Sequence, residues 1–193
     1  ALVQWLRDGL GLISDSSEIE ELAASVDDCG GVVFVPALAG LGAPHWDPET
    51  RGLVAGLTRG STAAHIARAA LEGIAFQIND ILSAMRIDLQ QEGTGTGNEL
   101  LELKVDGGAS NNNLLMQFQA DLLRCEVSRP SITSTTALGA ALQAGLTTGI
   151  FESTDQIRET WREDRRFIPL MEETEALENQ SRWEAAVRQA RTS

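Results

Sequence analysis

The sequence contains little cysteine and no long apolar run. Its two cysteines, Cys29 and Cys125, are too few for a disulfide framework and lack the paired spacing of a zinc site. We therefore expect a reducing, cytoplasmic setting. No apolar segment is long enough to span a bilayer, and no secretory signal opens the chain. These absences argue against a secreted, disulfide-stabilised or membrane-spanning protein.

Positive charge is also scarce. The 15 Lys and Arg residues stand against 28 Asp and Glu residues, which gives a formal net charge of −13. Nucleic-acid backbones and anionic membrane surfaces require a basic footprint, so we expect neither as a partner. A nucleotide such as ATP stays possible, because its site needs only a few local donors.

The length of 193 residues is enough for one medium-sized domain, and we predict a single domain over residues 1–193. A helical pattern starts at Ala1 with no capping residue before it. This start is expected of a helix that belongs to a longer polypeptide.

Strand-like and helical segments alternate along the chain, which predicts an α/β fold. The expected strands are 32–35, 52–57, a short one from residue 101, and 125–127. The expected helices are 2–10, one from Ser16 or Ser17 to Val26, one from Ser61 or Thr62 to about Gln90, one around 114–122, one from Thr135 or Thr136, and one from Thr174 to Arg188. No helix or strand is expected in loops 36–50 and 92–98.

Two of the predicted helices carry distinct faces. Apolar residues recur at spacings of three and four in the longest one, which predicts one buried face: Ile66, Ala70, Ile74, Ile78, Ile81 and Met85. Small residues dominate the helix after Thr135, which predicts very close packing against a neighbour: Ala137, Gly139, Ala140, Ala141, Ala144 and Gly145. In the last helix, Leu177, Trp183 and Val187 are expected to face inward.

The junction Asp106-Gly107-Gly108 points most directly to chemistry. It follows a short alternating strand and precedes a helical pattern, and the glycines allow a phosphate or ring to approach the backbone. Asp106 could hold a metal-bound water, and Asn112 could reach a nucleotide. The alternative is a tight structural turn capped by Ser110 or an asparagine. The motif alone leaves both interpretations open, because it is neither a Walker loop nor GxGxxG.

A second unusual loop, GLGAPHWDP, occupies residues 40–48. Its His45 and Trp46 could line a substrate pocket, or the loop could be rigid with Trp46 as a packing anchor. His45 has no evident catalytic partner in the sequence. His65, at the start of a helix, is expected to cap or pack rather than to catalyse.

Several motifs in a fixed order resemble the C-terminal half of the FGGY carbohydrate kinases, and within that family most closely the glycerol kinases. The matching segments are 4–8, 40–48, the pattern Gly52, Val54, Gly56, Leu57, His65, Ile66 and 69–72, then 105–109, 115–121 and 136–141. The similarity runs from Gln4 to about Val187. Two features depart from the family pattern: His45 stands where many glycerol kinases have an aromatic residue, and the loop at 94–97 is longer.

The resemblance implies a ribonuclease-H-like, actin-like ATPase domain with a mixed sheet flanked by helices. It implies ATP and Mg²⁺ as cofactors, and glycerol or a related polyol held mainly by an N-terminal domain that is absent from this chain. Carried over to matching positions, Gln4, Gly108 and Asn112 are nucleotide-binding residues, with Gly107 and possibly Asp106 as weaker companions. The full-length enzyme is expected to be a homo-oligomer.

The same resemblance places the catalytic base upstream, so no catalytic residue and no metal ligand is assigned here. Phosphoryl transfer needs the acceptor, metal and nucleotide aligned in one site, so the isolated chain is expected to be inactive. Two alternatives stay open: a fragment of another FGGY sugar kinase, and a non-catalytic actin-like assembly module.

Overall fold

Two small sheets organise the protein. The computed structural model describes residues 1–91 and 100–191. Strand β1 (Val33–Val35) pairs antiparallel with β2 (Leu53–Ala55). In the second sheet, β4 (Glu126–Pro130) runs parallel to β3 (Glu102–Lys104) and antiparallel to β5 (Glu163–Phe167). The predicted mixed α/β architecture is therefore confirmed.

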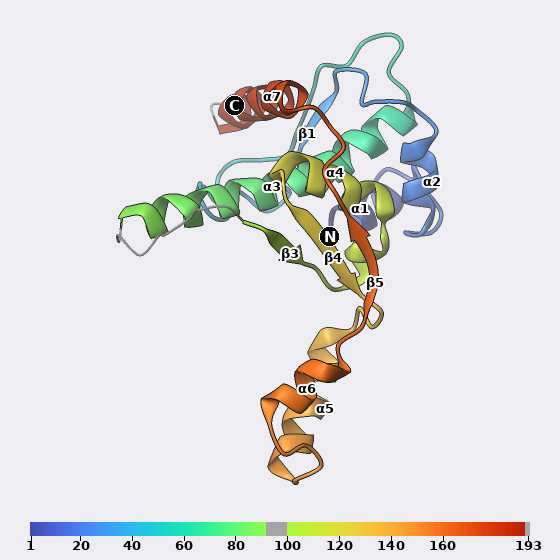
Figure 1. The fold of residues 1–193 in the computed structure, drawn as a ribbon. Coiled ribbons are helices and arrows are strands. Elements are labelled where there is room, and N and C mark those ends of the chain that lie inside the picture. Colours follow the sequence, from blue (N-terminus) through green and yellow to red (C-terminus); the bar gives the residue numbers. More distant parts are fainter. Residues whose placement is uncertain (92–99, 192–193) are drawn as a thin grey trace.

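Helices connect these strands, and most of them pack beside the two sheets (Figure 1). They are α1 (Leu2–Asp8), α2 (Glu18–Ala24), α3 (Ala63–Gln91), α4 (Asn113–Leu123), α5 (Thr135–Thr147), α6 (Thr154–Thr160) and α7 (Glu173–Arg191), with a 3₁₀ turn η1 (Gly108–Asn111) before α4. The sequence did not predict α6 or β5. Strand β5 reads EDRRF, and charged residues of this kind do not alternate with apolar ones.

The core lies where α3 crosses β1, α4 and α7. Phe76 of α3 stacks on Trp183 of α7 at a ring-centroid distance of 5.1 Å and meets Phe118 of α4 edge-on at 5.5 Å. A second buried cluster joins α1 and α2 to the N-terminal half of α3 through Leu6, Ile19 and Ala70, among others. These contacts hold the N-terminal helices beside the loop that precedes α4.

The predicted apolar face of α3 is only partly buried. Ala70 is fully buried, but Ile78, Ile81 and Met85 are 37%, 36% and 54% exposed. The C-terminal half of α3 extends outward from the packed region (Figure 1), so the described chain covers those three side chains only in part. The start of α3 agrees better with expectation, because His65 Nδ1 accepts a hydrogen bond from the Thr62 N–H (3.2 Å).

Residues 131–162, which carry α5 and α6, form a projection that we call the arm (Figure 1). The predicted close packing of α5 is wrong for most of its small residues: Ala137, Gly139, Ala140, Ala141 and Ala144 are exposed. Gly145 is the exception, since a Cβ added there would lie 2.7 Å from the Phe151 ring. The face stays open because α5 is carried away from the sheets.

Helix α7 follows its predicted pattern with one exception. Trp183 and Val187 are buried at 1% and 4% exposure, whereas Leu177 is 63% exposed. Within residues 1–91 and 100–191, no helix combines the length and apolar character needed to cross a membrane.

Candidate functional site

The loop between β3 and α4 is a tightly bonded turn. Gly107 has φ +78°, a conformation that strongly favours glycine. The Gly107 N–H donates to the Thr133 carbonyl (2.8 Å), and the Ser110 hydroxyl donates to the Gly107 carbonyl (2.7 Å). Asn112 Oδ1 accepts from the Leu115 N–H (2.8 Å) and so caps α4. The structural interpretation of this junction, as a capped turn, is thus confirmed.

A cavity of about 520 Å³ opens beside the same turn. Its lining residues come from α1, α2, α3, the turn and α4: Ala1, Leu2, Val3, Gln4, Ser16, Ser17, Ile19, Glu20, Leu71, Ile74, Gly108, Ala109, Asn111, Asn112 and Leu115. A hydrogen bond links α2 to the residue that follows the turn: Glu20 Oε1 accepts it from the Asn113 N–H (3.0 Å). The structure therefore brings Gln4 to the same cavity as Gly108 and Asn112, which follow it by 104 and 108 residues in the sequence.

Gly108 differs from Gly107 in what its position requires. Its φ lies outside the positive range, and a Cβ built on it would meet no atom within 4 Å. The fold itself therefore does not demand glycine at 108. Because Gly108 lines the cavity, a ligand could approach its backbone through this free space.

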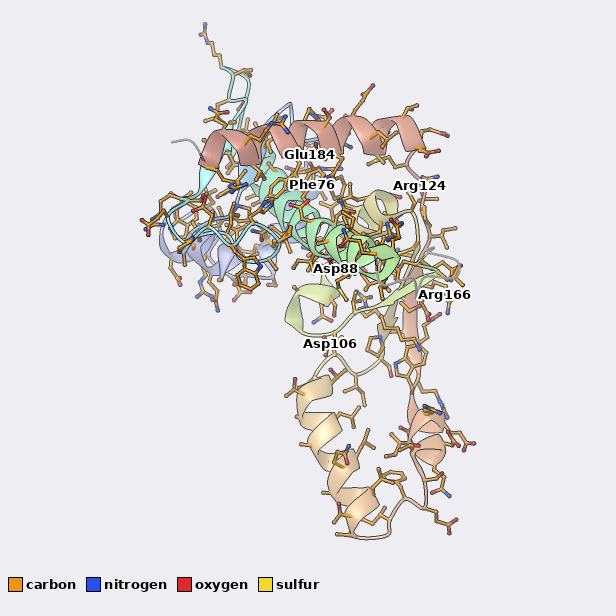
Figure 2. All side chains as sticks on the ribbon, turned by 90° about the vertical axis from the view of Figure 1, so that its left-hand side faces the viewer. Phe76, Asp88, Asp106, Arg124, Arg166 and Glu184 are labelled. Atoms are coloured by element: carbon orange, nitrogen blue, oxygen red, sulfur yellow. The ribbon has the colours of Figure 1, made fainter. Side chains whose placement is uncertain are left out.

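The two weaker predicted residues lie differently. Asp106 is not among the residues that line the cavity, and its carboxylate accepts a hydrogen bond from the Thr135 hydroxyl at the start of α5. Figure 2 shows Asp106 where the arm leaves the rest of the protein. Gly107 is also absent from the lining and contributes the shape of the turn.

No pattern in the sequence assigned Glu20, Ser16, Ser17, Leu71 or Ile74 to a binding site, although all five line the cavity. Glu20 lies in an acidic first turn of α2, a place where carboxylates are common for reasons of helix electrostatics. No local pattern could therefore distinguish it from Glu18 or Glu21.

The loop at residues 40–48 is anchored by polar contacts to α3 and α7. Asp80 Oδ2 lies 3.3 Å from His45 Nε2 and accepts a hydrogen bond from the Trp183 indole N–H (2.8 Å). Trp46 is 77% exposed with φ +48°, so the predicted role of Trp46 as a packing anchor is wrong. His45 and Asp47, not Trp46, link the loop to the two helices, since Asp47 Oδ2 lies 3.3 Å from Arg191 Nε on α7.

Helix α3 carries a largely buried carboxyl group, that of Glu72. Burial raises the pKa of Glu72, although Arg68, whose Nε lies 3.2 Å from Glu72 Oε1, acts in the opposite direction. Burial likewise raises the pKa of the nearby Cys29 thiol, which makes that thiol a poor nucleophile. Across residues 1–91 and 100–191, no group of three or more His, Cys, Asp or Glu side chains could hold a metal ion.

Comparison with known proteins agrees with this geometry. Residues 1–148 match the family model described as the FGGY family of carbohydrate kinases, C-terminal domain. The glycerol kinase of Albidiferax ferrireducens is 58% identical over 189 residues, which cover 98% of this chain and 38% of the relative. The glycerol kinase of Deinococcus radiodurans is 56% identical over 191 residues, covering 99% of this chain and 37% of the relative. The chain thus spans a little over a third of the length of these curated relatives.

Solved structures place the fold in the same group. The Plasmodium falciparum glycerol kinase, determined with ADP, superimposes with a TM-score of 0.83 at 34% identity, over 97% of this chain and 36% of that one. A xylulose kinase from Lactobacillus acidophilus shares the fold with a TM-score of 0.74 at 22% identity, over 97% of this chain and 36% of that one. The predicted ribonuclease-H-like, actin-like ATPase architecture is confirmed. The chain belongs to the FGGY family of carbohydrate kinases and corresponds to the C-terminal domain of that family.

Proposed function

We propose that the chain is the nucleotide-binding part of an ATP-dependent polyol kinase that converts glycerol and ATP to glycerol 3-phosphate and ADP. The observation that carries this proposal is the cavity at the Asp106–Asn112 turn, where Gln4, Gly108 and Asn112 converge. The relatives of high identity are glycerol kinases. This favours glycerol over a sugar as the acceptor, and it favours a kinase over an assembly module as the function.

The contacts of the cavity suggest how it would hold a nucleotide. The open space at Gly108 lets a flat ring or ribose lie against the backbone, and Leu71, Ile74 and Leu115 provide an apolar surface. Asn112 Oδ1 is already occupied by the helix cap, so a ligand would meet its Nδ2 amide group. Gln4, on α1, supplies a second amide.

The chemistry of transfer would be completed outside this chain. Phosphoryl transfer depends on holding the nucleotide, the acceptor hydroxyl and the base in one alignment. Mg²⁺ is usually held by one or two carboxylates together with the phosphates of the substrate, so we propose that it binds together with the nucleotide. We propose that the base and the polyol site belong to an N-terminal domain, that residues 1–193 act as one domain of a homo-oligomeric enzyme, and that the enzyme works in the cytoplasm.

The variant Gly108→Val in the full-length enzyme tests the proposal. The Cβ of valine would meet no atom within 4 Å at this position, but the side chain would occupy the region where the nucleotide approaches. We expect the KM for ATP to rise about tenfold or more, while the KM for glycerol changes little. Steady-state kinetics with each substrate varied in turn measures both values.

Gly60→Val is a matched control, because Gly60 has no positive φ and its nearest neighbour would be the Thr58 hydroxyl at 3.7 Å. It lies outside the cavity and should leave both constants unchanged. An equal rise of both KM values in Gly108→Val would mean that the turn is only structural. Phosphorylation of xylulose in preference to glycerol would overturn the assignment of the acceptor.

A further inference from the structure

Arg129 is a charged side chain buried beneath the turn that borders the cavity. It lies on β4, and its side chain is only 10% exposed. A buried charge is costly unless it is paired and hydrogen-bonded. The groups that bond to this guanidinium therefore indicate its structural role.

One side of the guanidinium is fixed by β5. Arg129 Nε donates to Asp164 Oδ2 at 2.8 Å, and Arg129 Nη2 forms an ion pair with the same oxygen at 2.7 Å. The Phe167 ring lies below it, with its centroid 5.5 Å from the guanidinium carbon. These contacts leave Nη1 as the group that points toward the turn.

The other side of the guanidinium holds the turn itself. Arg129 Nη1 donates to the Ser110 carbonyl (2.8 Å) and to the Asn111 carbonyl (3.2 Å), and it also lies 3.2 Å from Asn113 Oδ1. Asn111 and Asn113 flank Asn112 directly, and Ser110 follows Gly108 by two residues. The Arg129 guanidinium thus bonds to the segment that would contact the nucleotide.

We propose that Arg129 is a positioning residue that holds the Gly108–Asn112 segment in the geometry that binds the nucleotide. The inference rests on the proposed function of the cavity. A short turn with two glycines has many accessible conformations, and a site formed largely by backbone binds well only if it is held in place beforehand. A guanidinium fork supplies donors in fixed directions to Asp164 and to two carbonyl groups at once. Lysine, with a single ammonium group, cannot reproduce that arrangement.

Arg165 on β5 offers a matched control. Its guanidinium lies 4.7 Å from the same Phe167 ring, and its Nη1 lies 3.2 Å from the same Asn113 Oδ1. It is exposed, and its hydrogen bond within the described residues goes to Asn113 rather than to the Ser110 or Asn111 carbonyl. The two arginines therefore differ in the bonds that the proposal invokes.

The experiment uses the full-length enzyme with Arg129→Lys, Arg129→Met and Arg165→Met. Calorimetric titration with ADP gives the Kd, and steady-state kinetics gives the KM for ATP and for glycerol. We expect both Arg129 variants to raise the Kd for ADP and the KM for ATP about tenfold, because a charge-assisted hydrogen bond to the turn is lost. The KM for glycerol should stay within about twofold in all variants, and Arg165→Met should leave the nucleotide constants within about twofold.

Amide hydrogen exchange adds a measurement that needs no nucleotide. Peptides covering residues 107–113 should exchange faster in Arg129→Lys than in the parent protein and in Arg165→Met. If Arg129→Met does not fold, Arg129→Lys decides the question.

Unchanged nucleotide constants and unchanged exchange in a folded Arg129→Lys protein would overturn the inference while leaving the proposed function intact. A parent enzyme that does not bind ADP would overturn both.

Discussion

Gly73, in the middle of α3, should respond to alanine in the direction opposite to an ordinary helical glycine. Replacing an exposed helix-interior glycine by alanine normally stabilises a protein by about 0.5–1 kcal/mol. At Gly73 the added Cβ would lie 2.3 Å from the Phe34 carbonyl oxygen on β1, whereas ordinary contacts begin at 3.4 Å. Helix α3 and strand β1 would therefore have to separate by roughly 1 Å.

The magnitude follows from two opposing terms. Forcing an extra methyl group into a packed core costs about 1–3 kcal/mol. The neighbourhood cannot easily relax, since Phe34, Ala69 and Ala70 are buried at 2%, 2% and 0% exposure. After subtraction of the gain in helix propensity, we expect Gly73→Ala to lower the free energy of unfolding by about 1–2 kcal/mol.

Urea unfolding followed by far-UV circular dichroism measures this change. Gly139→Ala is the matched control: Gly139 lies inside α5, and an added Cβ there would meet nothing within 4 Å. The control should be neutral or stabilising by up to about 1 kcal/mol. A Gly73→Ala protein that is as stable as the parent, with an unchanged dependence on urea, would refute the close approach of α3 to β1.

Two further predictions concern single side chains. Burial raises the pKa of Glu72 above its ordinary value of 4.5, so the stability it contributes is complete below that pH and is lost as pH rises through the higher folded-state pKa. Glu72→Gln does not titrate, so its stability relative to the parent should increase with pH in denaturant titrations; a constant difference would contradict the burial of the charge. Asn112→Ala removes the cap of α4 and should cost about 1 kcal/mol, which is roughly 2–4 °C in melting temperature. Asn112→Asp keeps an accepting oxygen, so its melting temperature should lie near that of the parent. Equal melting temperatures of all three proteins would show that the cap does not stabilise α4.

Local pattern was a good guide where the burial of a segment depends on its own neighbours. The strand around Val33–Val35, the strand that leads into Asp106, and the inward face of α7 at Trp183 and Val187 were predicted from the sequence. Strand β5 could not be predicted in this way, because its charged side chains pair across the sheet: Arg166 forms ion pairs with Glu102 on β3 and Glu126 on β4. Such pairing exists only after distant segments have met.

The same distinction explains the misjudged helices. Periodicity marks which residues share a helix face, but whether another element covers that face depends on where the helix lies. The far half of α3 and the small-residue face of α5 lie outside the packed region, so Met85 and Ala141 are exposed despite their patterns. Leu177 is exposed for a different reason: its neighbours Ala176 and Asn179 are buried, so the first part of α7 does pack, but through another face of the helix.

The sequence by itself determined the mixed α/β class, the glycine turn and the family motifs, because each depends on residues close together in the chain. It also pointed to Gln4, Gly108 and Asn112 as a group. Only the tertiary structure decided that these three residues line one cavity, that Asp106 instead contacts Thr135, and that Arg129 supports the turn from below. The reason is physical: a cavity and a buried ion pair are formed by contacts between segments distant in the chain, and no local pattern specifies which segments will meet.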